Sequence, residues 1–182
     1  MIIVVITALV LIDNNKFGGD VKLENFAYDV ALSIRQTQVY GIAVKRFNNN
    51  FSTGYGMYFL GSDPNTYLLF ADENGTGLYD PSKPSEIVQT NGIDQGYAIS
   101  GLCVVAAAGT GVCVPATEID ILYVRPQPNA YISANVGAGA VSCVQNQRTA
   151  CFYEAQIQLS SPKGDKRAVI VDATGQISVV NN

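Results

Sequence analysis

The sequence contains no histidine, and only 14% of its residues are charged. Without imidazole, the usual general base for a serine or cysteine nucleophile is missing, and no GxSxG or SxxK pattern takes its place. The 15 acidic residues are scattered, and no two of them stand out as a catalytic pair. These absences argue against an enzyme.

The low charge accompanies 48% hydrophobic residues in a chain of 182. Such a chain is long and apolar enough for one domain with its own core, and too apolar for a disordered protein. The formal net charge is −4, so the overall field does not attract nucleic acid or anionic lipid. Lys163, Lys166 and Arg167 form a local basic group, but such a group is typical of a solvated turn. Nucleic acid is therefore not an expected partner.

The four cysteines are Cys103, Cys113, Cys143 and Cys151. Their spacing contains no CxxC pair, so a zinc site is not expected. Two local disulfides, Cys103–Cys113 and Cys143–Cys151, are the simplest of the three possible pairings, because each closes a short loop. The alternative is four unpaired buried thiols, which would fit a cytosolic protein.

No apolar run in the sequence is long enough to span a bilayer by itself. Residues Met1–Ile12 are apolar apart from Thr7, and a polar stretch with two glycines follows over Asp13–Asp20. As a helix this run would extend about 18 Å, whereas the hydrocarbon core of a bilayer is about 30 Å thick. It also lacks the basic segment and cleavage site of a secretory signal. An apolar helical stem and a buried first strand both remain compatible with its β-branched residues.

The periodicity becomes helical after this break. Apolar side chains recur at steps of three and four, at Leu23, Phe26, Ala27, Val30, Ile34 and Ile42. This pattern predicts an amphipathic helix over residues 20–47. The helix should end near Asn48–Asn50, because asparagine side chains favour turns.

Beyond this helix, residues 48–182 predict a β-rich head. The expected strands are Tyr55–Leu60, Tyr67–Ala71, Glu86–Thr90, Tyr97–Val105, Asp120–Val124, Tyr131–Ala134, Glu154–Leu159, Ala168–Asp172 and Gln176–Val180. Ala155, Ile157 and Leu159 should face a core, and Gly175 suits a tight turn between the last two strands. The predicted fold class is α+β, with residues 1–19 as an apolar stem and break, and a helix packed on an antiparallel sheet or sandwich.

The segment Asp72–Asp80 partly matches the first half of a calcium-binding loop. It places oxygen-bearing side chains at Asp72, Asn74, Thr76 and Asp80. The carboxylate expected at the twelfth position is replaced by Lys83, and Gly75 and Gly77 suit a hairpin turn equally well. A turn is therefore favoured over a calcium site.

Three segments, Leu23–Val44, Phe70–Asp80 and Arg167–Val179, carry a family resemblance when read together with the apolar start. Together they resemble the pseudopilins of the GspH/FimT type over most of the chain. The resemblance implies a pilin-like, non-catalytic subunit of a type II secretion system or a type IV pilus, with no cofactor. Its stem would anchor in the inner membrane and then pack with other pilin subunits, while the head faces an extracytoplasmic space or the cell surface.

The resemblance assigns assembly to the stem residues Ile2, Ile3, Val4, Val5, Ile6, Leu9, Val10, Leu11 and Ile12. The family's basic leader, processing glycine, following phenylalanine and nearby glutamate are not found here, so we expect the sequence to begin several residues inside the stem. The alternative function is a ligand-binding head on the same scaffold, as an adhesin or a DNA-uptake subunit. Lys163, Lys166 and Arg167 would then carry the binding of DNA.

Overall fold

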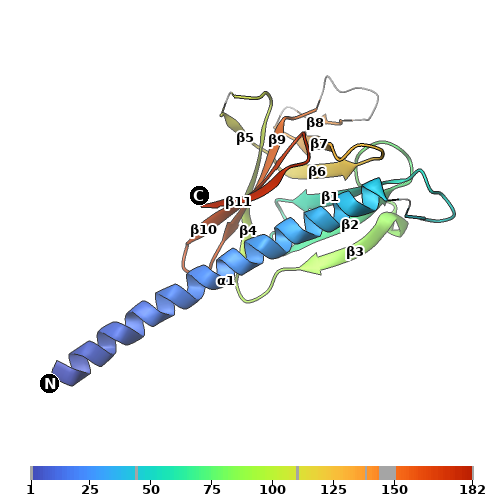
Figure 1. The fold of residues 1–182 in the computed structure, drawn as a ribbon. Helices are drawn as coiled ribbons and strands as arrows, with labels where there is room; N and C mark the ends of the chain where they lie inside the picture. The colour runs from blue at the N-terminus through green and yellow to red at the C-terminus, as the bar shows by residue number, and fades with distance from the viewer. Residues whose placement is uncertain (1, 44, 110, 138, 144–150, 182) are drawn as a thin grey trace.

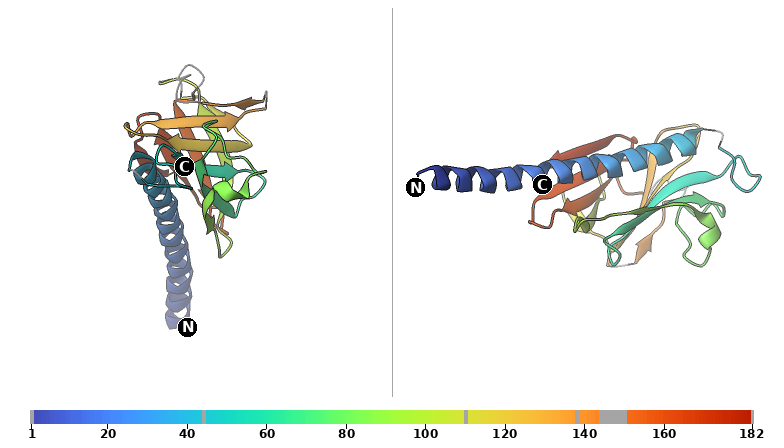
Figure 2. Two further views of the ribbon diagram at one scale, coloured as in Figure 1. Left: turned by 90° about the vertical axis from the view of Figure 1, so that its right-hand side faces the viewer. Right: turned by 90° about the horizontal axis from the view of Figure 1, so that it is seen from below.

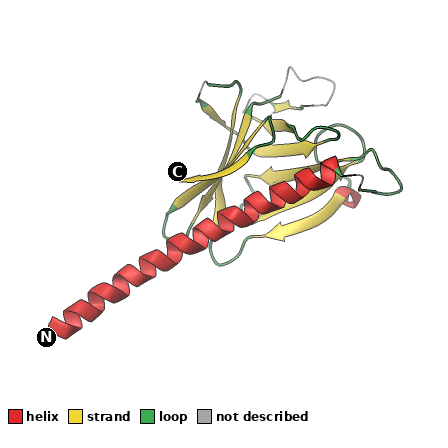
Figure 3. Ribbon diagram, viewed as in Figure 1, coloured by secondary structure: helices red, strands yellow, loops and turns green. Residues whose placement is uncertain are grey.

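The computed structural model describes residues 2–43, 45–109, 111–137, 139–143 and 151–181, and the side chains of 2–18, 20 and 140 lie outside this description. Within it, one long N-terminal helix accompanies two antiparallel sheets (Figures 1 and 3). The predicted α+β class is therefore confirmed.

Helix α1 runs from Ile2 to Ile42 without interruption. The break expected within residues 1–19 is absent, and the apolar start is helical and not a strand. Gly18 and Gly19 lie inside the helix, where each costs only about 1 kcal/mol relative to alanine. No proline interrupts the segment, so the hydrogen-bond ladder can continue through it. The prediction failed because two glycines weaken a helix without ending it.

The N-terminal half of α1 extends well beyond the sheets, and the C-terminal half lies along them (Figures 1 and 2). At 1.5 Å per residue the whole helix is about 60 Å long. In the part of the chain that the structure describes, no helix combines the length and the apolar character that crossing a membrane requires.

The helix ends at Ile42, five residues before the predicted end at 47. Phe47 and Asn50 exchange backbone hydrogen bonds of 2.9 and 2.7 Å across a tight turn. Asn48 and Asn49 form the turn with φ angles of +44° and +65°. Asparagine tolerates this left-handed conformation better than most residues. The asparagines thus close a hairpin turn of their own, and the helix must end earlier to let the chain enter it.

The first sheet has six strands in the order β3-β2-β1-β6-β7-β8. They are β1 (Gly54–Leu60), β2 (Thr66–Asp72), β3 (Ile87–Gly92), β6 (Glu118–Tyr123), β7 (Ala130–Asn135) and β8 (Ala140–Val141). A short 3-10 turn, η1 (Pro84–Glu86), precedes β3.

The second sheet has five strands in the order β11-β10-β9-β4-β5. They are β4 (Ala98–Val105), β5 (Cys113–Pro115), β9 (Glu154–Ser160), β10 (Lys166–Asp172) and β11 (Ile177–Asn181). The nine expected strands are all present within two residues at each end, including the closing hairpin β10–β11. The short strands β5 and β8 were not predicted.

The main core lies between the two sheets, and α1 closes one side of it. Leu23, Ala27, Val30 and Ile34 form the buried stripe of the helix, and all four are 0% exposed. In β9, Ala155, Ile157 and Leu159 face this core as predicted. The side chains of Glu154, Gln156 and Gln158, expected to face water, are partly covered.

Two polar contacts fix the docked half of the helix. Gln38 Nε2 donates hydrogen bonds to the carbonyls of Pro128 and Gly175, at 2.9 and 3.0 Å. These carbonyls belong to the β6–β7 and β10–β11 connections, so one side chain joins the helix to both sheets.

Near the helix end, a Cβ on Gly41 would lie 2.4 Å from the carbonyl oxygen of Tyr123. Only glycine permits this close approach to β6.

Candidate functional site

The stem is the first site expected from the sequence. Its backbone is helical, as part of α1, and it projects from the head (Figure 2). The side chains of the expected assembly residues, from Ile2 to Ile12, lie outside the described part of the chain.

An apolar stripe continues along the exposed side of α1. Its members, with their exposed fractions, are Val21 (42%), Tyr28 (55%), Leu32 (67%), Val39 (54%) and Ile42 (36%). The first four follow steps of seven, four and seven, which is the spacing of a helix–helix seam. At 100° per residue they lie on the side of the helix opposite to the buried stripe. The helix thus has two apolar sides, and only one of them is covered by the head.

A hollow of about 360 Å³ borders this exposed stripe. It lies between the helix and the start of β11, and its lining residues are Tyr28, Asp29, Ala31, Leu32, Arg35 and Ile177. Projecting apolar side chains beside a shallow apolar hollow provide the knob and the hole of helix packing. The spacing of three and four residues predicted the buried stripe but wrongly included Ile42, which is exposed near the helix end. The exposed stripe was not predicted, although its seven-residue spacing is present in the sequence.

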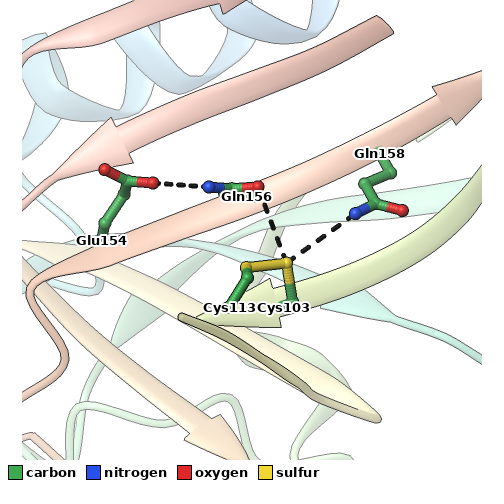
Figure 4. Close-up of a disulfide and its surroundings, with 5 residues drawn as sticks. All are labelled: Cys103, Cys113, Glu154, Gln156 and Gln158. Carbon is green, nitrogen blue, oxygen red and sulfur yellow. Dashed lines mark hydrogen bonds between the residues drawn. A yellow bond between two sulfur atoms is a disulfide. The ribbon is translucent and has the colours of Figure 1, made fainter. Parts of the chain in front are cut away.

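The four cysteines form two disulfides in the pairing preferred from the sequence, Cys103–Cys113 and Cys143–Cys151. The first joins edge strand β5 to β4 (Figure 4). Gln158 Nε2 donates toward Cys103 Sγ at 3.8 Å, and Gln156 Nε2 donates to Glu154 Oε1 at 2.7 Å. Disulfides of this kind indicate an oxidising, extracytoplasmic environment.

A second, smaller cluster covers the outer face of the six-stranded sheet. Its buried members are Tyr58, Phe70, Leu122, Tyr131 and Cys143. The loop of residues 73–86 covers this cluster, and Tyr79 packs against Tyr58 and Phe70 with ring centroids 4.9 and 5.7 Å away. Gly77 lies so close to Cys143 that a Cβ would come within 2.7 Å of its carbonyl oxygen.

The same loop contains the expected calcium residues. Asp72 accepts hydrogen bonds from the amides of Thr76 and Gly77, and Asn74 Oδ1 accepts from the Thr76 amide and hydroxyl. Asp80 instead accepts from the amide and hydroxyl of Ser82. The oxygens of these residues thus accept hydrogen bonds within the turn, and no group of three or more acidic or cysteine side chains among the described residues is placed to hold a metal ion.

Two further carboxylates accept backbone amides of this loop, and no sequence pattern marks either of them. Asp120, which is 1% exposed, accepts the amide of Tyr79 at 2.9 Å. Glu86, which is 0% exposed, accepts the amide of Asp80 at 3.3 Å through Oε2. Strand alternation places Asp120 on the outer face of β6, but periodicity does not reveal that a loop covers it.

Burial changes the acidity of these groups. Desolvation raises the pKa of Asp120 well above its usual value, although the hydrogen bond from the Tyr79 amide acts in the opposite direction. Desolvation likewise raises the pKa of Asp72 and of Glu86, and amide donors again oppose the shift. The pKa of Glu118 is also raised by desolvation.

The basic group proposed for DNA lies at the turn between β9 and β10 and at the start of β10. Lys163 and Lys166 are exposed, and Arg167 is partly covered and donates to the Lys166 carbonyl. A Cβ on Gly19 would lie 3.8 Å from the Lys163 side chain, so this turn lies beside the helix. The exposed Lys163 lies in a turn as the sequence predicted, whereas Lys166 and Arg167 belong to strand β10.

Comparison of the chain with protein-family models, with curated proteins and with solved structures found no match in any of the three. Functional inference therefore depends on the geometry of the chain itself. Its clearest unexplained feature is the long helix with an uncovered apolar stripe.

Proposed function

We propose that this protein is a non-catalytic structural subunit of the pseudopilin or minor-pilin kind, which assembles into a filament through helix α1. The observation that carries the proposal is the exposed apolar stripe of Val21, Tyr28, Leu32 and Val39 on a helix that projects from its head. An apolar helix surface of this length is stable when it packs against other apolar helices.

The arrangement of the helix supports assembly in two ways. Its projecting half lies outside the head, so neighbouring copies can reach it from several sides. Its docked half carries the stripe in the spacing of a helix–helix seam. Before assembly, the stem would lie in the inner membrane, as the sequence resemblance implies. In the filament, stems would pack inside and heads would face outward.

The outward position of the heads fits their covalent chemistry. One disulfide fastens edge strand β5 to β4, and the other includes Cys143, which lies beneath the loop of residues 73–86. Such bonds form in the oxidising space that an exported head would face. The head thus has the properties of an exported domain, and the helix those of an assembly element.

The test compares two apolar side chains with nearly equal exposure. Leu32 on the stripe is 67% exposed, and Val112 beside β5 is 66% exposed. Neither Leu32→Asp nor Val112→Asp should unfold the head, because both side chains already face water. The full chain is purified in mild detergent, and its size distribution is measured by analytical ultracentrifugation over a range of concentrations.

We expect wild type and Val112→Asp to form oligomers as concentration rises, and Leu32→Asp to dissociate to monomers. A charge buried in a helix seam destabilises association by several kcal/mol, because burying an unpaired carboxylate has that cost. If Leu32→Asp associates as strongly as Val112→Asp, or if wild type is monomeric at every concentration, assembly through this stripe is wrong.

A further inference from the structure

Three carboxylates contact the loop of residues 73–86: two belong to strands of the sheet, and the third stands at the end of the loop itself. Asp72 ends β2, Asp120 lies in β6 and Glu86 ends η1. Each accepts at least one backbone amide from the loop of residues 73–86, and the donors are Thr76, Gly77, Tyr79 and Asp80. The strand carboxylates Asp72 and Asp120 therefore attach the loop to the sheet, and Glu86 ties the end of the loop to its middle.

One of these carboxylates is incompletely satisfied. Glu86 Oε1 is buried and has no hydrogen-bond partner, while Oε2 accepts the Asp80 amide. A buried carboxylate oxygen without a hydrogen-bond donor leaves part of the desolvation cost of the charge uncompensated. Uptake of a proton removes most of that cost, because a neutral carboxyl is far easier to bury.

The charges around these groups are mainly negative. Glu118 lies two residues from Asp120 on the same side of β6, and Asp72 raises the pKa of both Asp120 and Glu86 through charge repulsion. Asp80 acts on Glu86 in the same direction. Tyr58 on β1 is the strand partner of Asp120 on β6, and the ring of Tyr79 from the loop packs against the ring of Tyr58. On β7, the partner of Asp120 is the neutral Ser133.

Among the described residues that act on these carboxylates, Lys83 is the one base. It lowers the pKa of Asp72 and of Glu86. Its Nζ lies 4.0 Å from Asp80 Oδ2, and its side chain is 46% exposed. Water therefore screens its charge, and the pair with Asp80 already uses it. One partly exposed lysine does not neutralise three buried carboxylates.

We propose that the loop of residues 73–86 is a proton-controlled clamp, which is held closed on the outer face of the six-stranded sheet when Asp120 or Glu86 is protonated, and opens more readily as these groups ionise. This regulatory role goes beyond filament assembly and does not depend on it. The loop and α1 lie on opposite faces of the sheet, because the helix packs in the inner core and the loop on the outer cluster.

The sign of the effect follows from proton linkage. The closed loop raises the pKa of these carboxyls, so the closed form binds more protons than the open form in which water solvates them. Closure is then favoured at low pH and weakens as pH rises from about 4, the ordinary carboxyl range, through the raised values. A single coupled proton changes the opening equilibrium by at most about tenfold per pH unit.

The test is hydrogen exchange of the full chain, read by mass spectrometry at about pH 5 and about pH 8 and corrected for intrinsic exchange rates. We expect the loop amides of Tyr79 and Asp80 to be less protected at the higher pH, by up to about tenfold per pH unit for each coupled proton, whereas β9 changes little. Asp120→Asn and Glu86→Gln each keep an oxygen acceptor for the amide, and each should raise loop protection at the higher pH. Asp94→Asn, at an exposed position between β3 and β4, is the matched control.

Equal corrected protection of the wild-type loop at both pH values overturns the proposal, whatever the variants do. So does loop protection that Asp94→Asn raises as much as Asp120→Asn does. If calcium chloride restores full protection to the wild-type loop at the higher pH, a cation and not a proton closes the clamp, and the proposal is again wrong.

Discussion

Replacement of Gln38 by alanine should weaken the attachment of α1 to the head more than any other single truncation of a polar helix side chain. Gln38 is 4% exposed, and its amide donates to the carbonyls of Pro128 and Gly175. Gly175 is buried, so its carbonyl would lose its donor where water does not easily replace it. Arg35 would lose the acceptor Gln38 Oε1.

The magnitude follows from these contacts. A typical intramolecular hydrogen bond contributes about 1 kcal/mol, and a buried acceptor left without a donor costs about 1 to 3 kcal/mol. For Gln38→Ala we therefore expect a loss of about 3 kcal/mol in the free energy of unfolding. In a protein of this size such a loss lowers Tm by about 6 to 12 °C.

The assay is urea denaturation of the full chain followed by circular dichroism, with Gln176→Ala as the control. Gln176 is an exposed glutamine next to Gly175, so its truncation should change the unfolding free energy by less than about 0.5 kcal/mol. Gln38→Glu should destabilise at least as much as Gln38→Ala, because a carboxylate cannot donate to either carbonyl. Equal stability of Gln38→Ala and Gln176→Ala would show that Gln38 does not hold the helix to the two sheets.

Three further predictions use the same denaturation assay. Gly175→Ala should lower the free energy of unfolding more than Gly164→Ala does. Both glycines have positive φ, but only at Gly175 would a Cβ meet a carbonyl oxygen, at 2.0 Å. Equal losses would mean that backbone strain alone causes the effect. Gly41→Ala should lose about 1 to 3 kcal/mol through its clash with Tyr123, while Gly92→Ala, with nothing within 4 Å, should not. The double variant Cys103→Ser/Cys113→Ser should lose about 2 to 3 kcal/mol of unfolding free energy, because the disulfide no longer restricts the unfolded chain across a sequence separation of 10. An unchanged urea midpoint would contradict this.

The sequence predicted those features that depend on local periodicity. Alternation located nine strands, and the three-to-four spacing located the buried stripe that includes Leu23 and Ile34. It failed where a feature depends on tertiary packing. The helix end was misplaced because Asn48 and Asn49 form a turn of their own, and β5 and β8 are too short to give a periodic signal.

The candidate sites divide in the same way. The disulfide pairing was accessible because short loops favour local bonds. The clamp carboxylates Asp120 and Glu86 were not, because in the sequence they resemble the other acidic residues. Their burial arises only when the loop of residues 73–86 folds back over the outer face of the sheet.

The two sides of α1 differ in a way that bears on assembly. The docked side combines apolar packing with contacts of fixed geometry, the Gln38 hydrogen bonds and the close approach at Gly41. These contacts prevent the head from rotating about the helix axis, since rotation would break the hydrogen bonds. The exposed stripe is apolar and can pack against more than one partner surface. The rotational position of the head about the helix axis is therefore fixed. When helices pack together, their packing also fixes the direction in which the outer face of the six-stranded sheet and the loop of residues 73–86 point.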